Sequence, residues 1–154
     1  MNFNKKLIIT LLSITLFIHF SSLIADKAKK FIIFQPVSNS AVDHVCPLYG
    51  KAKEINKDKI YRVVVIPMVL MNYHPQGGRI IFNEDLSFKG FAYVGAAGGS
   101  IGEQFDILIV ETDEKGSIVF DNYIKNAAAT NKWTGMSSLP RNTIEKARVR
   151  VIRK

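Results

Sequence analysis

The apolar run at residues 60–71 constrains the fold more than any other feature of the sequence. Residues 63–66 are Val, Val, Val and Ile in succession, and β-branched side chains favour extended strands over helices. A strand with apolar side chains on both faces has no polar face to turn to water, so we expect it to be buried on both sides. Such a strand belongs in the interior of a sheet-rich fold.

Three later segments are predicted as strands, in which successive side chains point to opposite faces, and the last of them has a clear alternation of apolar and polar residues. They lie at residues 87–95, 104–112 and 146–154. The residues that share an apolar face are Phe88, Gly90, Ala92 and Val94 in the first, Phe105, Ile107 and Ile109 in the second, and Ala147, Val149 and Val151 in the third. On the opposite face of the last segment, Arg148 and Arg150 form part of a short basic ladder.

Weaker strand patterns occur at residues 31–34, at 79–82, and at 45–55, where Pro47 and Gly50 interrupt the run. Short strands separated by Gly, Pro and Asn turns are typical of a β-sandwich. We therefore predict an all-β fold, an antiparallel β-sandwich.

One segment near the end of the chain has a helical period instead. Its apolar side chains fall at i, i+3, i+4, i+7 and i+8, the stripe of an amphipathic helix. These residues are Phe120, Tyr123, Ile124, Ala127 and Ala128. Asp113 is placed to cap the first turn, so we expect one short helix near 114–128. A strand over 117–124 is the alternative, because a glycine and two β-branched residues weaken the helix.

The first 25 residues have the layout of a secretory signal peptide. Lys5 and Lys6 precede the uncharged apolar run 7–18, and small residues follow up to Ala25, after which we expect cleavage. The alternative is an uncleaved membrane anchor, because residues 7–25 are just long enough to span a bilayer. Either way, the remaining chain is expected outside the cytoplasm, in the periplasm or the extracellular space, with a membrane tether in the second case.

The domain organisation follows from the leader. Residues 1–25 are the signal peptide or anchor, residues 26–44 an N-terminal extension with a short strand, and residues 45–154 the β-sandwich domain.

Residues 1–25 hold two of the 21 basic residues and none of the 13 acidic ones, so the rest of the chain has a formal net charge of +6. This charge favours anionic surfaces. Nucleic acid is not an expected partner, because the chain is exported and lacks long basic runs and a recognition-helix pattern.

The sequence contains few groups that could carry out chemistry. Cys46 is the single cysteine, so no internal disulfide forms and the residue is expected to be a small buried side chain. No second Cys/His pair accompanies His44 and Cys46 at zinc spacing, and we expect no metal site and no cofactor. The glycine-rich loop 95–102 precedes a strand rather than a helix, which argues against phosphate binding.

No hydrolase motif is present either. The sequence has no G-x-S-x-G elbow, and its carboxylates are scattered, mostly beside turns. We therefore predict that the protein is not an enzyme.

Aromatic side chains in predicted connections are the better functional lead. Tyr73, His74 and Trp133 lie between the predicted strands, where exposed rings stack on sugars or anchor protein partners. With Gln76, Arg148 and Arg150 they form the set of candidate ligand-binding residues. The stretch 73–78 reads Tyr-His-Pro-Gln-Gly-Gly, in which proline fixes φ and the glycines allow the chain to reverse. We expect this stretch to be mainly a turn that connects two strands, and only secondarily a surface that contacts a ligand.

Residues 45–154 resemble an uncharacterised immunoglobulin-like module of exported or membrane-tethered bacterial proteins. The resemblance rests on an aromatic-x-Pro-Gln stretch, a Gly-rich loop with a following G-x-x-F-x-I-x-V strand, and a later Trp-x-Gly…Leu-Pro stretch. The matching residues are Tyr73, Pro75, Gln76, Phe88, Gly95, Gly102, Phe105, Ile107, Ile109, Trp133, Gly135, Leu139 and Pro140. Phe88 stands where the module usually has Trp after an Asp-Gly turn. The resemblance implies that the antiparallel β-sandwich is immunoglobulin-like and has a recognition role, and it assigns no ligand or catalytic residue.

Together these features predict a non-enzymatic recognition or accessory module at the cell envelope, binding a glycan or a protein at the cell surface. The alternative is a structural subunit of a surface fibre, a homo-oligomer or filament. In that case the hydrophobic strand near the mature N-terminus completes the sheet of a neighbouring subunit. The candidate assembly residues are Phe31, Ile32, Ile33 and Phe34.

Overall fold

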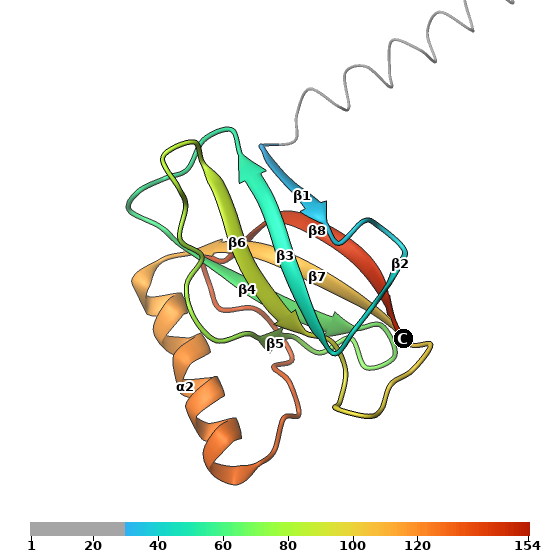
Figure 1. The fold of residues 1–154 in the computed structure, drawn as a ribbon. Coiled ribbons are helices and arrows are strands. Elements are labelled where there is room, and N and C mark those ends of the chain that lie inside the picture. The colour runs from blue at the N-terminus through green and yellow to red at the C-terminus, as the bar shows by residue number, and fades with distance from the viewer. Residues whose placement is uncertain (1–29) are drawn as a thin grey trace, which may run out of the picture.

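The computed structural model describes residues 30–154, so the predicted leader and its cleavage site lie outside the described residues. The described chain is mostly β-sheet with one helix, as the strand patterns predict (Figure 1). The strands and the helix are β1 Phe31–Gln35, β2 Ser40–Val42, β3 Val45–Ala52, β4 Ile60–Pro67, β5 His74–Pro75, β6 Ser87–Tyr93, β7 Gln104–Thr112, α2 Glu114–Thr130 and β8 Ile144–Arg153.

The strands form two sheets. The smaller has the order β1-β3-β6 and the larger the order β2-β8-β7-β4-β5. All neighbouring strands are antiparallel except β2 and β8, which are parallel. Residues 31–42, predicted as an extension of the domain, thus contribute one strand to each sheet. The predicted strand at 79–82 does not form, and its Phe82 makes only an isolated bridge with Phe88.

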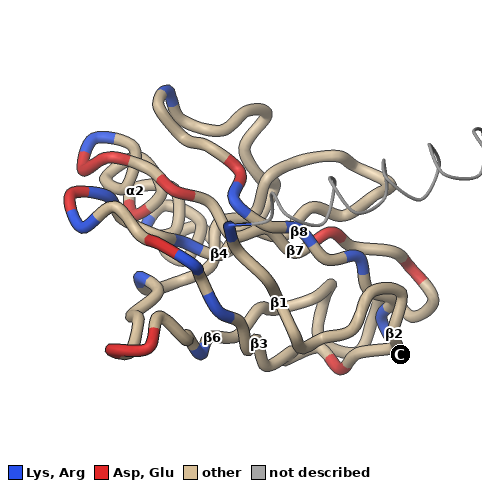
Figure 2. The backbone as a smooth tube through the Cα atoms, turned by 90° about the horizontal axis from the view of Figure 1, so that it is seen from above, with Lys and Arg blue, Asp and Glu red and all other residues tan. Residues whose placement is uncertain are grey.

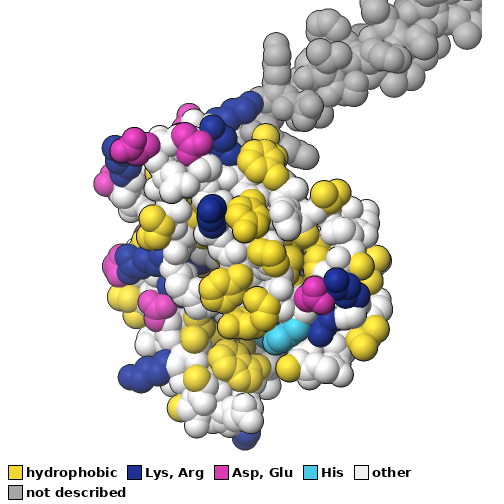
Figure 3. All heavy atoms as spheres, viewed as in Figure 1, with side chains coloured by type: hydrophobic (Ala, Val, Ile, Leu, Met, Phe, Trp, Pro, Cys, Tyr) yellow, Lys and Arg dark blue, Asp and Glu magenta, His cyan; other side chains and the backbone are white. Residues whose placement is uncertain are grey.

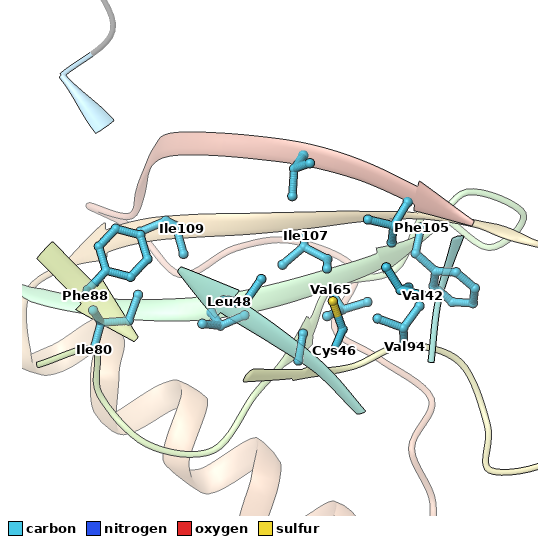
Figure 4. Packing of buried hydrophobic residues seen from close by; sticks show 14 of the residues in the cluster. Val42, Cys46, Leu48, Val65, Ile80, Phe88, Val94, Phe105, Ile107 and Ile109 are labelled. Atoms are coloured by element: carbon cyan, nitrogen blue, oxygen red, sulfur yellow. The ribbon is translucent and has the colours of Figure 1, made fainter. Parts of the chain in front are cut away.

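The main hydrophobic core lies between the two sheets. Cys46, Leu48 and Phe88 of the smaller sheet face Val65 and Ile107 of the larger one (Figure 4). The residues predicted to share one face in 87–95, 104–112 and 146–154 lie on the side of this core, with Gly90 and Ala147 partly buried. In 104–112 the opposite face is buried as well, at Asp106, Leu108 and Val110. Burial of apolar side chains is the main force that holds two such layers together.

A second core covers the outer face of the larger sheet. Helix α2 packs across β4 and β7, where Phe120 meets Val64, Ile66, Leu108 and Val110. These four residues alternate along β4 and β7 with those of the main core, so the helix covers the larger sheet on the side away from β3 and β6. The expectation that the strand within 60–71 is buried on both sides is therefore confirmed, with one face on each core.

The helix near 114–128 is confirmed, and its predicted cap forms. The side chain of Asp113 accepts a hydrogen bond from the N–H of Gly116 at 2.8 Å. This bond satisfies one of the N–H groups that every helix leaves without an internal partner at its start. Backbone hydrogen bonding by Gly116 is the first cause that holds the pKa of Asp113 below its usual range. Among the described residues, no helix has both the length and the apolar character that crossing a bilayer requires.

Candidate binding surface

The outer face of the smaller sheet carries a continuous band of apolar and aromatic side chains. Its Ile, Val, Phe and Tyr side chains are each 40 to 54% exposed, and the band crosses the surface that Figure 3 presents to the viewer. We call this surface the aromatic face and define it by Ile32, Phe34, Val45, Pro47, Tyr49, Phe91 and Tyr93. Because adjacent strands contribute to it, the face is a contiguous patch rather than a set of scattered surface residues.

The register between β3 and β6 brings these side chains close together. The N–H of Tyr93 donates to Oε1 of Gln76 at 2.9 Å and therefore points away from β3. Tyr93 and its partner on β3 therefore form a non-hydrogen-bonded pair, the type in which facing side chains come closest. The non-hydrogen-bonded pairs between these strands are Val45–Tyr93, Pro47–Phe91 and Tyr49–Lys89. Pro47 has no N–H to donate, so a proline is tolerated at such a position.

The rings on the aromatic face contact one another edge-on. Phe91 and Tyr93 have ring centroids 5.4 Å apart with an interplanar angle of 77°. The ring of His44 lies 5.4 Å from that of Tyr93, and the ammonium of Lys89 stands 5.9 Å from the centroid of Tyr49. Edge-to-face packing stabilises the rings where they stand, so the surface is preformed.

Two of the predicted loop residues turn out to join elements of the fold. Tyr73 forms a two-way backbone bridge with Met136, at 2.9 and 2.8 Å, and packs on the core beneath the helix. Gln76 is buried, and its side chain donates to the carbonyl of His74 and accepts from Tyr93. Gln76 therefore links the connection after β5 to the edge of the smaller sheet.

His74 lies in strand β5 rather than in a connection, and Trp133 lies in the connection from α2 to β8. His74 is partly buried, and within residues 30–154 its Nε2 atom has no hydrogen-bond partner. Burial lowers the pKa of this imidazole. Trp133 is half exposed and meets Tyr123 edge-on at 6.5 Å. The Cα of Gly135 approaches His74 so closely that an added Cβ would stand 2.8 Å from Nε2.

The two arginines of the predicted basic ladder hold a buried carboxylate. Arg148 and Arg150 both bind Asp106, at 2.6 and 2.7 Å, and Asp106 has no exposed side-chain surface. Burial opposes ionisation of Asp106, but hydrogen bonds from the two guanidinium groups outweigh it and hold the pKa of Asp106 below its usual range. Figure 2 shows basic and acidic residues interspersed along the chain rather than gathered on a separate basic face.

The candidate assembly residues lie in β1, which pairs with β3 of its own chain. Phe31 is buried in the main core and Ile33 packs against it. Ile32 and Phe34 point outward and extend the aromatic face across a third strand. The structure thus brings these two residues together with residues of β3 and β6, and it leaves Tyr73, His74, Gln76 and Trp133 outside this surface.

A concave feature, separate from the aromatic face, lies at the start of β1. It is a groove of about 550 Å³ whose lining includes Phe31, Tyr61, Glu111 and Lys146. The Tyr61 hydroxyl donates to Glu111 at 2.6 Å, and Lys146 binds the same carboxylate at 3.1 Å. Burial and this hydrogen bond raise the pKa of Tyr61 to about 12. The polar groups in the groove are thus largely committed to each other.

Within residues 30–154, no group of three or more His, Cys, Asp or Glu side chains is arranged to hold a metal ion. Cys46 is buried in the main core, and burial, with the nearby charge of Asp43, raises the pKa of its thiol to about 11. A thiol with such a pKa is a poor nucleophile at neutral pH, because the thiolate is the reactive form.

No protein-family model matches the sequence, and a search of curated proteins returns no match.

Most residues of the aromatic face are not among the binding residues predicted from the sequence. Its signal was present in the alternation of 87–95, where Phe91 and Tyr93 take the positions opposite the apolar face. Large aromatic residues at outward positions of a half-buried strand are unusual, because water-facing positions favour polar side chains. The contribution of Val45 and Tyr49 needs the pairing of β3 with β6 and has no local signal.

Proposed function

We propose that this protein is a non-enzymatic binding module of the cell envelope that docks a protein partner through the aromatic face. The observation that carries the proposal is the exposed, contiguous apolar surface of β1, β3 and β6. Contiguous exposed apolar patches mark interaction sites on soluble proteins. Phe and Tyr are enriched at the cores of protein interfaces, while Lys, Glu and Asp are depleted there.

The geometry favours a protein over a glycan as the ligand. Ring stacking on a flat sugar chain needs coplanar aromatic faces, whereas Phe91 and Tyr93 meet at 77°. Sites for small ligands are concave and carry a few placed polar groups, but the aromatic face is a sheet surface with mostly apolar side chains. A partner protein can cover such a surface with apolar side chains of its own.

The proposal includes an immunoglobulin-like β-sandwich, and the strand order supports it. In that fold, strands A, B and E are neighbours in one sheet, and strands G, F and C in the other. The orders β1-β3-β6 and β8-β7-β4 match these two sheets if β1 is strand A, β3 is B, β4 is C, β6 is E, β7 is F and β8 is G. The short strand β2 then continues strand A, and β5 takes the place between C and E. Cys46 then lies on strand B without a cysteine partner on F, and α2 is an insertion between F and G. The resemblance to the module of exported bacterial proteins is part of the same proposal.

The proposed location, outside the cytoplasm, rests on the signal-peptide pattern of residues 1–25, with a membrane tether if the leader is retained. Fibre assembly through residues 31–34 is the alternative function. The outward positions of Ile32 and Phe34 on an edge strand favour it. The pairing of β1 with β3 in the same chain favours the docking module instead.

The docking proposal is tested by placing charges on the aromatic face. The double variant Phe91→Lys/Tyr93→Lys is compared with Ile118→Lys, whose side chain on α2 is similarly exposed. Extracts of the cell envelope are fractionated by size for each full-length chain. We expect the wild-type chain and Ile118→Lys to elute in a complex and the double variant to elute alone. Elution of all three chains at the same size would contradict the proposal.

A further inference from the structure

Apolar side chains also project from one end of the molecule, away from the aromatic face. Val69, Leu70 and Met71, in the connection from β4 to β5, are 75, 63 and 55% exposed. Ile101, in the connection from β6 to β7, is 73% exposed. We call these four residues the apolar end. Exposed apolar residues in succession at a loop tip are not needed for the core, which makes them candidates for contact with a partner.

Strand register places the two connections side by side. Pro67, the last residue of β4, pairs with Phe105 near the start of β7. The N–H of Met68 donates to the carbonyl of Gln104 at 3.0 Å. Figure 1 shows both connections at the same end of the two sheets, near the C-terminus. The four apolar side chains therefore belong to one surface.

Hydrogen bonds within the turns hold these tips in place. The N–H groups of Leu70 and Met71 both donate to the carbonyl of Pro67, at 3.2 and 2.8 Å. The N–H of Gly102, next to Ile101, donates to the carbonyl of Arg153 at 2.7 Å and ties the second turn to β8. Because the turns are closed, the apolar side chains are presented to the outside and cannot simply fold back onto the core.

The apolar end is also poor in exposed charge. Residues 67–73 and 95–102 contain no Asp, Glu, Lys or Arg. Glu103, which is exposed, directly follows the second turn, and the neighbouring basic side chains are paired, Lys154 with Asp43 at 3.1 Å and Arg150 with Asp106 at 2.7 Å. Stripping water from a charged group is the main cost of moving a surface into an apolar medium. Residues 67–73 and 95–102 can make that move without this cost, provided that Glu103 stays outside with the basic residues.

We propose that the apolar end docks on the surface of a phospholipid bilayer. The four apolar side chains enter the boundary between headgroups and acyl chains, and Arg150 and Lys154 stay at headgroup level, where long basic side chains remain hydrated. The apolar residues stand on two separate tips rather than on one flat face, and a fluid bilayer accommodates separate tips more readily than a folded protein surface does. The strands then run toward the membrane, so the aromatic face stands beside it and remains open to a partner.

The proposal is tested with environment-sensitive fluorophores on single introduced cysteines. Leu70→Cys and Ile101→Cys probe the apolar end, and Ile81→Cys is the control. Ile81 is 74% exposed, and its neighbour Ile80 bonds to Tyr61 at the other end of β4. The native Cys46 stays unlabelled because it is buried in the core. The full-length chain is mixed with vesicles of phosphatidylethanolamine and phosphatidylglycerol that carry a nitroxide quencher at the top of the acyl chains.

We expect the vesicles to quench the fluorophores at positions 70 and 101 and to leave that at position 81 bright. The quenching should persist at high salt, because apolar insertion is not screened. Equal quenching at all three positions, or quenching at position 81 alone, would show that another part of the chain holds the membrane and would overturn the proposal. Absence of quenching at positions 70 and 101 would also overturn it and would leave the apolar end to a protein partner or a second copy of the chain.

Discussion

Asp106 is a fully buried acidic residue that joins strand β7 to two arginines of strand β8. Its carboxylate has no exposed surface and binds both Arg148 and Arg150. Asp106→Asn removes the charge that these guanidinium groups bind, while the two arginines, 42 and 39% exposed, remain in contact with water. The loss is therefore that of charge-assisted hydrogen bonds, and we expect it to lower the free energy of unfolding by about 2 kcal/mol, measured by urea denaturation.

Asp43→Asn is the matched control for Asp106→Asn. Asp43 also pairs with a basic residue, Lys154, but both side chains are largely exposed. Exposed ion pairs contribute about 1 kcal/mol or less. Equal destabilisation by the two variants would contradict the assigned role of Asp106. The low pKa of Asp106 also predicts that its contribution is complete above an unfolded-state pKa of about 3.9 and is lost as the pH falls through the folded value.

His74 gives the protein a second dependence on pH. Burial lowers its pKa, so the unfolded chain binds a proton more readily than the folded one. Stability from this residue is complete above the unfolded pKa of about 6.5 and is lost as the pH falls below it. We expect His74→Phe to reduce the loss of stability between about pH 7 and about pH 5, where histidines titrate.

The fluorescence of Trp133 measures this effect, because it is the single tryptophan and lies two residues from Gly135, which packs on His74. Unfolding curves are recorded at both pH values for the wild-type chain and the variant. Any packing cost of the larger ring is present at both pH values and cancels from the comparison. The same pH dependence in both chains would show that other groups control the acid response.

At the scale of elements, helix α2 packs on the larger sheet mainly through one fully buried side chain, that of Phe120. Phe120 has no exposed surface, packs on Val64, Ile66, Leu108 and Val110, and lies under the guanidinium of Arg62 at 5.7 Å. We expect Phe120→Ala to cost about 3–5 kcal/mol, the range for a large aromatic residue removed from a core. Thermal unfolding measures the change.

Ile118→Ala is the control for Phe120→Ala, because Ile118 lies on the same helix and is half exposed. Its loss should cost about 1 kcal/mol or less, since little buried surface disappears. A similar cost for both substitutions would mean that the helix is not held by its inward stripe.

The elements themselves could be predicted from local patterns. Side-chain patterns along the chain and the chemistry of a helix cap predict the buried strand within 60–71, the later strands and the helix after Asp113. Local patterns fail at the segment 79–82. Its apolar residues resemble a strand, but only Phe82 finds a bridging partner, because strand formation depends on a neighbouring chain segment as well as on propensity.

At the scale of the whole molecule, the features that could not be predicted are those made by contacts between residues far apart in the sequence. Arg148 and Arg150 look like free basic residues until β7 pairs with β8 and places Asp106 opposite Arg150. In the same way, the candidate loop residues Gln76 and Tyr73 hold connections together. The aromatic face exists only because β1, β3 and β6 become neighbours. Local sequence patterns carry no information about such pairings.

Site-specific photo-crosslinking in living cells tests the central claim, that the aromatic face docks a protein, most directly. A photoreactive phenylalanine analogue replaces Phe91 in the full-length chain, or Ile118 on α2 as the control of similar exposure. We predict a discrete crosslinked product of one mass from position 91 and none from position 118. No product from position 91, or the same products from both positions, would contradict the account.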